Sequence, residues 1–130
     1  MIDVHDLCVG NWVYDGNTTQ FPMFIRTIGE DYVYLDFEEN EGDLWESKPE
    51  DLYGIPLSED LLSKVGLHQT GSVWEHPGLY FEVDFNIEKG VYYPSYNWAE
   101  YYIAKPIKYL HELQNLFWNI TKQQLKVDIW

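Results

Sequence analysis

The sequence predicts an α+β protein with antiparallel strands in both halves, a short helix between them and a longer helix near the carboxyl end. Three observations predict this class. Apolar and polar side chains alternate over several short segments that are separated by turn residues, which is typical of half-buried strands. Residues 58–66 carry helix start and stop signals. Beyond residue 106, large apolar residues recur every three or four positions.

The first 51 residues are predicted to form a β part. Strands are expected over residues 8–14, 21–28 and 32–37. Asp15-Gly16 is a hairpin-type turn signal, and Pro22 should stand at a strand start or edge because it has no N–H group. These strands predict an antiparallel three-stranded meander or a small curled barrel. Cys8 is expected to be buried in the first strand.

An acidic run follows these strands. Residues 38–51 are polar and are broken by Gly42 and Pro49, so they are predicted to form a loop. With Asp36, this stretch resembles an EF-hand loop over residues 36–47. The required glycine and final glutamate are each displaced by one residue, so a solvated acidic loop is favoured over a weak cation site.

A helix of about two turns is predicted over Glu59–Val65. Ser58 is a good N-cap, and acidic residues in the first turn favour the positive end of the helix dipole. Gly66 stands where a left-handed residue is wanted after a helix, and Leu67 can then fold back onto Leu62.

Antiparallel strands are predicted again between residues 67 and 105. They are expected over residues 80–87, 91–97 and 99–104. Alternation places Phe81 and Val83 on one face of the first of these strands, with Glu82 and Asp84 on the other. Pro94 makes its strand irregular or an edge.

The C-terminal helix is predicted over residues 107–120. Its apolar positions are Ile107, Leu110, Leu113, Phe117 and Ile120. Such a helix packs against a sheet. Thr121 and Gln124 have capping-box spacing, which predicts a second short turn over 122–125, and residues 127–130 can end as a strand. We expect a single domain over 1–130, with parts 1–51 and 52–130.

Charge bounds the class of partner. The 130 residues have a net charge of −14, and the first 60 hold fifteen acids and two bases. Such a surface repels phosphates, so direct binding to nucleic acid or to anionic membranes is not expected. No stretch approaches the ~20 apolar residues of a membrane helix, and the first residues do not resemble a secretion signal. The predicted location is cytoplasmic.

Motifs for known chemistries are missing. One cysteine excludes an internal disulfide and a thiol-rich zinc site. His111 begins "HELQN", which lacks the second histidine of the zinc-protease motif. We therefore expect His111, Gln114 and Asn115 to bond neighbouring backbone. The sequence has no P-loop, "GxGxxG" or "GxSxG" motif. No catalytic residue, cofactor or metal site is predicted, which argues against an enzyme.

Two surfaces are candidates for binding. Six of the twelve residues 91–102 are tyrosine or tryptophan, and exposed rings of this kind suit recognition of a protein partner. The candidates are Tyr92, Tyr93, Tyr96 and Trp98. The competing interpretation is that the C-terminal helix covers most of these rings. The second surface is an acidic patch made of Asp36, Glu38, Glu39, Glu41, Asp43 and Glu46.

Three segments resemble a family of small uncharacterised bacterial proteins. They are "VGNWV" at 9–13, "IPLSEDLLSKVGL" at 55–67 and "IKYLHELQNLFWNITKQQL" at 107–125. The resemblance spans most of the chain and is most specific in the last segment. It implies association with prophages and other mobile elements, and it supplies no catalytic residue. Lys122 stands where this family often has glycine.

These observations lead to two main hypotheses. The first is a non-enzymatic protein-interaction or accessory module of a mobile element. The second is an acidic decoy that mimics nucleic acid and occupies the groove of a basic DNA-binding protein. A small hydrolase with a site between sheet and helices is a residual alternative.

Overall fold

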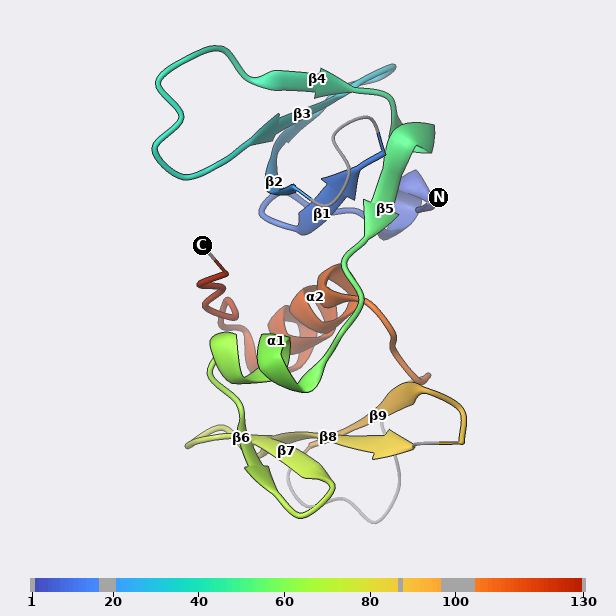
Figure 1. Ribbon diagram of the computed structural model, residues 1–130, viewed down its shortest axis with the longest axis vertical. Coiled ribbons are helices and arrows are strands. Elements are labelled where there is room, and N and C mark those ends of the chain that lie inside the picture. The colour runs from blue at the N-terminus through green and yellow to red at the C-terminus, as the bar shows by residue number, and fades with distance from the viewer. Residues whose placement is uncertain (1, 17–20, 87, 97–104, 130) are drawn as a thin grey trace. The chain divides into compact units, whose positions relative to one another are not determined.

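A computed structural model describes residues 2–16, 21–86, 88–96 and 105–129. The chain divides into two compact units, Met1–Pro56 with Tyr109–His111, and Leu57–Lys108 with Glu112–Trp130. The first unit holds a five-stranded antiparallel sheet, and the second holds a four-stranded antiparallel sheet, helix α1 and most of helix α2 (Figure 1). The predicted α+β class is confirmed.

The first sheet has the strand order β4-β3-β2-β1-β5. Its strands are β1 (Trp12–Asp15), β2 (Pro22–Ile28), β3 (Val33–Asp36), β4 (Trp45–Ser47) and β5 (Leu52–Gly54). Each pairs with its neighbour in antiparallel fashion. The meander of the first three strands is confirmed, and Pro22 opens its strand. The prediction of a loop over 38–51 is wrong at β4. This edge strand has only three residues and shows no alternation of apolar and polar side chains, so the sequence pattern did not indicate it.

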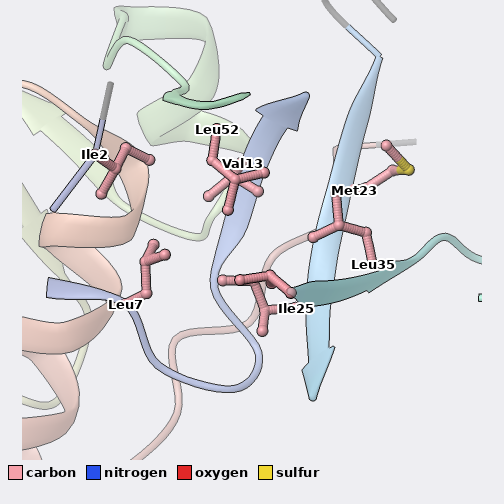
Figure 2. Packing of buried hydrophobic residues seen from close by; sticks show 8 residues of the cluster. Ile2, Leu7, Val13, Met23, Ile25, Leu35 and Leu52 are labelled. Carbon is pink, nitrogen blue, oxygen red and sulfur yellow. The ribbon is translucent and has the colours of Figure 1, made fainter. Parts of the chain in front are cut away.

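The first sheet curls around its own apolar face. Val13, Met23, Ile25, Leu35 and Leu52 point into one cluster, which Ile2, Leu7 and Val33 complete (Figure 2). Across this face, the Trp45 indole N–H donates to Asp15, which joins β4 at one edge to β1. The strands β4 and β5 do not pair, so the described strands form an open curled sheet and no closed barrel.

Cys8 is exposed, which corrects the prediction that it is buried. The chain turns before β1 begins, and Gly10 takes a left-handed φ of 93° in this turn. The Asn11 side-chain oxygen accepts from the Cys8 N–H at 2.8 Å. The first strand therefore starts four residues later than predicted, and Cys8 lies outside it. Two short 3-10 turns, Val4–Asp6 and Pro49–Asp51, complete this unit.

Helix α1 (Glu59–Lys64) has the predicted caps. The Ser58 hydroxyl accepts from the Leu61 N–H at 3.2 Å. Gly66 has a φ of 93°, and the Leu67 N–H donates to the Leu62 carbonyl at 3.1 Å. The left-handed glycine and this hydrogen bond end the helix, and the bond gives a donor to a carbonyl of the last turn that would otherwise lack one.

The second sheet has the strand order β6-β7-β8-β9. Its strands are β6 (His68–Thr70), β7 (Val73–His76), β8 (Phe81–Asn86) and β9 (Val91–Tyr96). The predicted alternation in β8 is confirmed, since Phe81 and Val83 are fully buried. Pro94 lies in an edge strand, as predicted. The strand predicted over 99–104 lies outside the described residues.

Helix α2 (Leu110–Thr121) covers one face of the second sheet through its later turns (Figure 1). Phe117 is buried, and its ring meets the Phe81 ring edge-on at 5.3 Å. The helix begins three residues later than predicted, because Ile107 pairs with Tyr92 through two backbone hydrogen bonds of 2.8 and 2.9 Å.

The end of α2 departs from the prediction. Thr121 is the last helical residue, one position beyond the predicted end, and Lys122 turns left-handed with a φ of 59°. Residues 122–129 contain neither the predicted helical turn nor the predicted strand. The Thr121 hydroxyl instead accepts from the Gln123 N–H at 3.2 Å. Neither described helix is long and apolar enough to cross a membrane.

Candidate functional site

The strongest candidate site is residues 36–47, which we name the acidic hairpin. It consists of Asp36 at the end of β3, the connection 37–44, and β4. All but one of its six carboxylates reach solvent. The exposed ones are Glu38, Glu39, Glu41, Asp43 and Glu46. Asp36 differs from the rest of the predicted acidic patch, because only 11% of its side chain is exposed.

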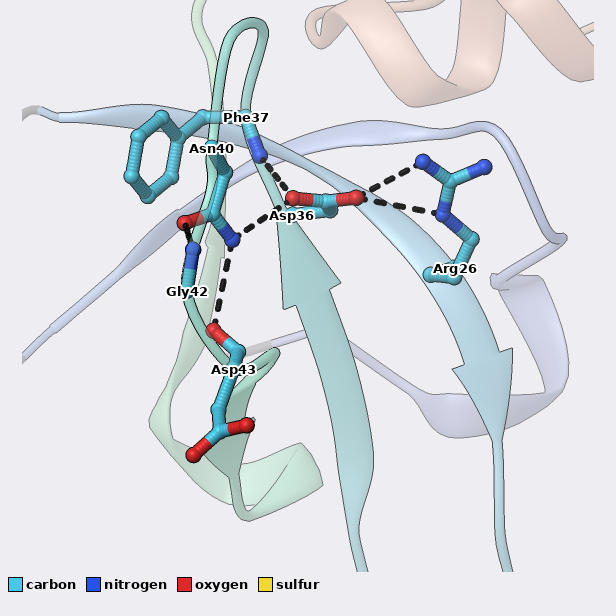
Figure 3. A network of polar contacts seen from close by, with 6 residues as sticks. All are labelled: Arg26, Asp36, Phe37, Asn40, Gly42 and Asp43. Atoms are coloured by element: carbon cyan, nitrogen blue, oxygen red, sulfur yellow. Dashed lines mark hydrogen bonds and ion pairs between the residues drawn. The ribbon is translucent and has the colours of Figure 1, made fainter.

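Asp36 is the centre of a polar network (Figure 3). Its Oδ2 accepts from Arg26 Nη2 at 2.7 Å and from Arg26 Nε at 3.2 Å. Its Oδ1 accepts from the Phe37 N–H and from Asn40 Nδ2, both at 2.9 Å. Both carboxylate oxygens therefore accept hydrogen bonds. These bonds compensate for the water that a buried carboxylate loses, so the charged form is kept.

A β-bulge positions the arginine of this network. The pairing of β2 with β3 shifts its register between Ile25 and Thr27, so Arg26 is the extra residue. Bulges re-aim side chains locally. Here the Arg26 guanidinium lies 5.1 Å from the centre of the Phe24 ring. Phe24 pairs with Asp36 across the two strands, so the guanidinium reaches the Asp36 carboxylate.

Asn40 extends the network into the connection. Its Oδ1 accepts from the Gly42 N–H at 3.0 Å, and its Nδ2 also donates to the Asp43 carbonyl at 3.3 Å. Directly before Asn40, Glu39 adopts a left-handed φ of 64°, a conformation that is uncommon for a residue other than glycine and that the surrounding contacts must stabilise. One buried carboxylate thus shapes the backbone that carries the exposed ones.

The same contacts lower the pKa of Asp36. The Arg26 hydrogen bond is the largest cause and the Asn40 hydrogen bond the next, both of which favour the charged carboxylate over the protonated one. The network therefore exists in full only where Asp36 is ionised.

Apolar surface lies beside the carboxylates. The Leu44 side chain and the Trp45 ring are exposed, Trp45 by 46%. The indole N–H of Trp45 is anchored, since it donates to Asp15 Oδ2 at 2.5 Å. Asp15 itself is buried and also accepts from the Ser47 hydroxyl at 3.4 Å. A ring held at one end and open at the other is a ready contact surface.

The structure does not bring the predicted tyrosines onto one face. Tyr92 is only 4% exposed, and its ring packs on Phe85 at 4.9 Å. Tyr96 pairs with Phe81, on the face that carries α2, and Tyr93 pairs with Asp84 on the opposite face. Trp98 lies outside the described residues. Partner binding by Tyr93 and Tyr96 stays a prediction.

A second carboxylate group lies on the second sheet. Glu75 and Glu82 face each other across β7 and β8. With His76 and Tyr80 they line a shallow pocket of about 150 Å³ at the β7–β8 turn. Partial burial raises the pKa of Glu82, and the charges of Glu75 and Asp84 raise it further. Such a carboxyl holds a proton more readily than an ordinary glutamate does.

His111, the other candidate for chemistry, lies at the start of α2. It is 3% exposed, and its ring stacks on Tyr109 with the ring centres 5.9 Å apart. Burial of this kind suits a structural histidine. In the part of the chain that the structure describes, no three His, Cys, Asp or Glu side chains converge on a position that could hold a metal ion.

The sequence interpretation missed Arg26, Asp15 and Trp45. Asp36 stands on the polar side of an alternating strand, so alternation predicted that its side chain is exposed. The available signal was a lone arginine in a half of the chain that is almost free of bases. An arginine that is one of only two bases among fifteen acids is a natural partner for a carboxylate that must be buried.

Comparison with known proteins found no matching family model, no matching curated protein and no matching solved structure.

Proposed function

We propose that the protein is a non-enzymatic interaction module that works in the cytoplasm as an accessory of a mobile element and binds a basic protein through the acidic hairpin. One observation carries the proposal. Four exposed carboxylates stand on a connection whose backbone is bonded, through Asn40, to the buried carboxylate of Asp36, and the exposed Trp45 ring follows in β4.

This arrangement favours binding for two physical reasons. A connection already shaped by hydrogen bonds loses less conformational freedom when a partner docks, so less of the interaction energy is offset. Its carboxylates attract a basic surface and orient it during encounter. The half-exposed Trp45 ring adds the aromatic anchor that such interfaces use.

The test compares two charge-matched variants. The first neutralises four hairpin carboxylates to the corresponding amides: Glu38, Glu39, Glu41 and Asp43. The second does the same at four exposed carboxylates outside the hairpin: Glu30, Asp31, Glu88 and Asp128. Both variants lose the same charge. The probes are lysine- and arginine-rich peptides, with affinity measured by isothermal titration at low and at physiological salt.

We expect the hairpin variant to bind at least about tenfold more weakly than the native chain, and the control variant to change by less than about threefold. Equal losses in the two variants would show that net charge alone attracts the peptides, and the proposal would be abandoned.

The acidic decoy is the narrower form of this proposal. The shaped connection supports it, since a mimic of nucleic acid needs its charges in a fixed layout. A decoy must displace DNA from a basic DNA-binding protein when it is added in excess. If the protein binds the DNA-binding protein without displacing DNA, the decoy hypothesis is wrong and the interaction-module hypothesis stands.

A further inference from the structure

The strand β4 ends the first sheet on one side. It pairs with β3 alone, and no described residue hydrogen-bonds to its backbone from the other side. An edge of this kind presents unpaired N–H and C=O groups, which can accept another extended chain.

Other edges of the two sheets are partly occupied. On β5, the Leu52 carbonyl accepts from the Ile2 N–H at 3.2 Å. On β9, Tyr92 exchanges two backbone hydrogen bonds with Ile107. The strand β6, His68–Thr70, is an edge of the same length as β4 and carries no acidic residue. It serves as an internal reference.

The charge around β4 selects its occupant. Glu46 lies within the strand and the hairpin carboxylates precede it. Lys48 follows the strand, and Arg26 is already bonded to Asp36. A second copy of this chain would bring the same carboxylates against themselves, with a net charge of −14 on each molecule. A basic segment gains from the same field.

Alternation along β4 adds a pattern. Trp45 pairs with Leu35 on the curled inner face, and Glu46 pairs with Tyr34 on the outer face. A chain lying beside β4 would place one residue next to the exposed Trp45 ring and the next one beside Glu46. Apolar and basic residues in alternation match these two positions.

We propose that the outer edge of β4 pairs with an extended segment of a partner protein in which basic and apolar residues alternate. This inference rests on the proposed function and deepens it, because it adds backbone pairing to the attraction between charges.

The probe is an acetylated peptide of about eight alternating lysine and valine residues, compared with its fully N-methylated form. N-methylation keeps the charges and side chains but removes the backbone donors. We expect the methylated peptide to bind at least about tenfold more weakly. Amide hydrogen exchange should slow in β4 when the first peptide binds, and should stay unchanged in β6.

A single-residue pair sharpens the test. Glu46→Gln should weaken binding of the unmethylated peptide several-fold, while Glu88→Gln, at another exposed position, should not. Equal affinity of the two peptides, with hairpin neutralisation still harmful, would overturn edge pairing and leave the proposed function. If methylation weakens binding while neutralising the hairpin carboxylates does not, edge pairing stands and the proposed function is overturned. A peptide that fails to bind at about 1 mM would also overturn edge pairing.

Discussion

Asp36 and Glu82 are both carboxylates on inner strands of antiparallel sheets, but their surroundings move the pKa in opposite directions. Asp36 in the first sheet has an arginine and an amide as partners, and its pKa is lowered. Glu82 in the second sheet is partly buried between Glu75 and Asp84, and its pKa is raised. The register of each sheet decides which neighbours each carboxylate meets.

The two sheets also bury their apolar faces differently. The first curls until side chains of β4 and β1 meet across it. The second stays open and receives Phe117 from a helix. On the curled sheet Asp36 has a cation as its partner, whereas on the open sheet Glu82 faces other carboxylates. The predictions below test this difference.

The largest effect is expected where the second sheet depends on its helix. Phe117→Ala removes a buried ring that packs on Phe81 and should lower the free energy of unfolding by about 3–5 kcal/mol. Chemical denaturation, monitored by amide hydrogen exchange, measures this change in the free energy of unfolding. Trp118→Ala, at an exposed neighbouring position, is the control and should cost below about 1 kcal/mol. Equal effects would contradict the packing of α2 on this sheet.

Asp36→Asn should destabilise the first sheet by about 1–2 kcal/mol, because charge-assisted bonds are lost to a partly exposed arginine. The folded-state pKa of Asp36 is lowered, so its contribution is present above the unfolded value near 4 and is lost as pH falls through the folded pKa. The difference in unfolding free energy between the native and Asp36→Asn chains should therefore be present at pH 7 and should shrink as the pH falls below about 4. Glu38→Gln should change little, and a matching loss there would contradict the network.

Lys122→Gly should stabilise the end of α2 by about 0.5–1 kcal/mol, since an L-residue is strained at a φ of 59° and glycine is not. Lys122→Ala removes the side chain without relieving the backbone and should not stabilise. Thermal unfolding of both variants measures the difference. A gain in the alanine variant would assign the effect to charge instead.

The smallest effect is expected at Glu82. Its raised pKa means that the charged form disfavours the fold, so Glu82→Gln should raise stability at pH 7 by a few tenths of a kcal/mol, about 0.5 at most. The gain should disappear below pH about 4, where Glu82 is protonated in both states. Glu88→Gln is the exposed control. A gain in stability that persists at low pH would show that the effect of Glu82→Gln is not electrostatic.

Local signals were read correctly along much of the chain. The caps of α1, the alternation of β8 and the stop of α2 at Thr121 each depend on residues within a few positions of one another. The burial of Cys8, the predicted loop at β4 and the helical turn after Thr121 were wrong. Each depends on a turn, on an edge pairing or on a left-handed residue that composition does not reveal.

The candidate site was predicted in part. A dense run of acids marked residues 36–47 correctly as acidic, but the sequence placed Asp36 among the exposed carboxylates. Its partner is ten residues away along the chain, and a bulge brings the two together. The tyrosines of β9 show the same limit, since alternation divides them between two faces once the strand is paired.

By itself the sequence determined the class of fold, the helix boundaries set by caps, and a strong negative charge concentrated in the first 60 residues, because these follow from near neighbours and from composition. Tertiary structure alone decided which hairpin carboxylate is buried and which strands lie at the edges of the described sheets. Those outcomes depend on register, bulges and curling, which join residues that are distant in the chain.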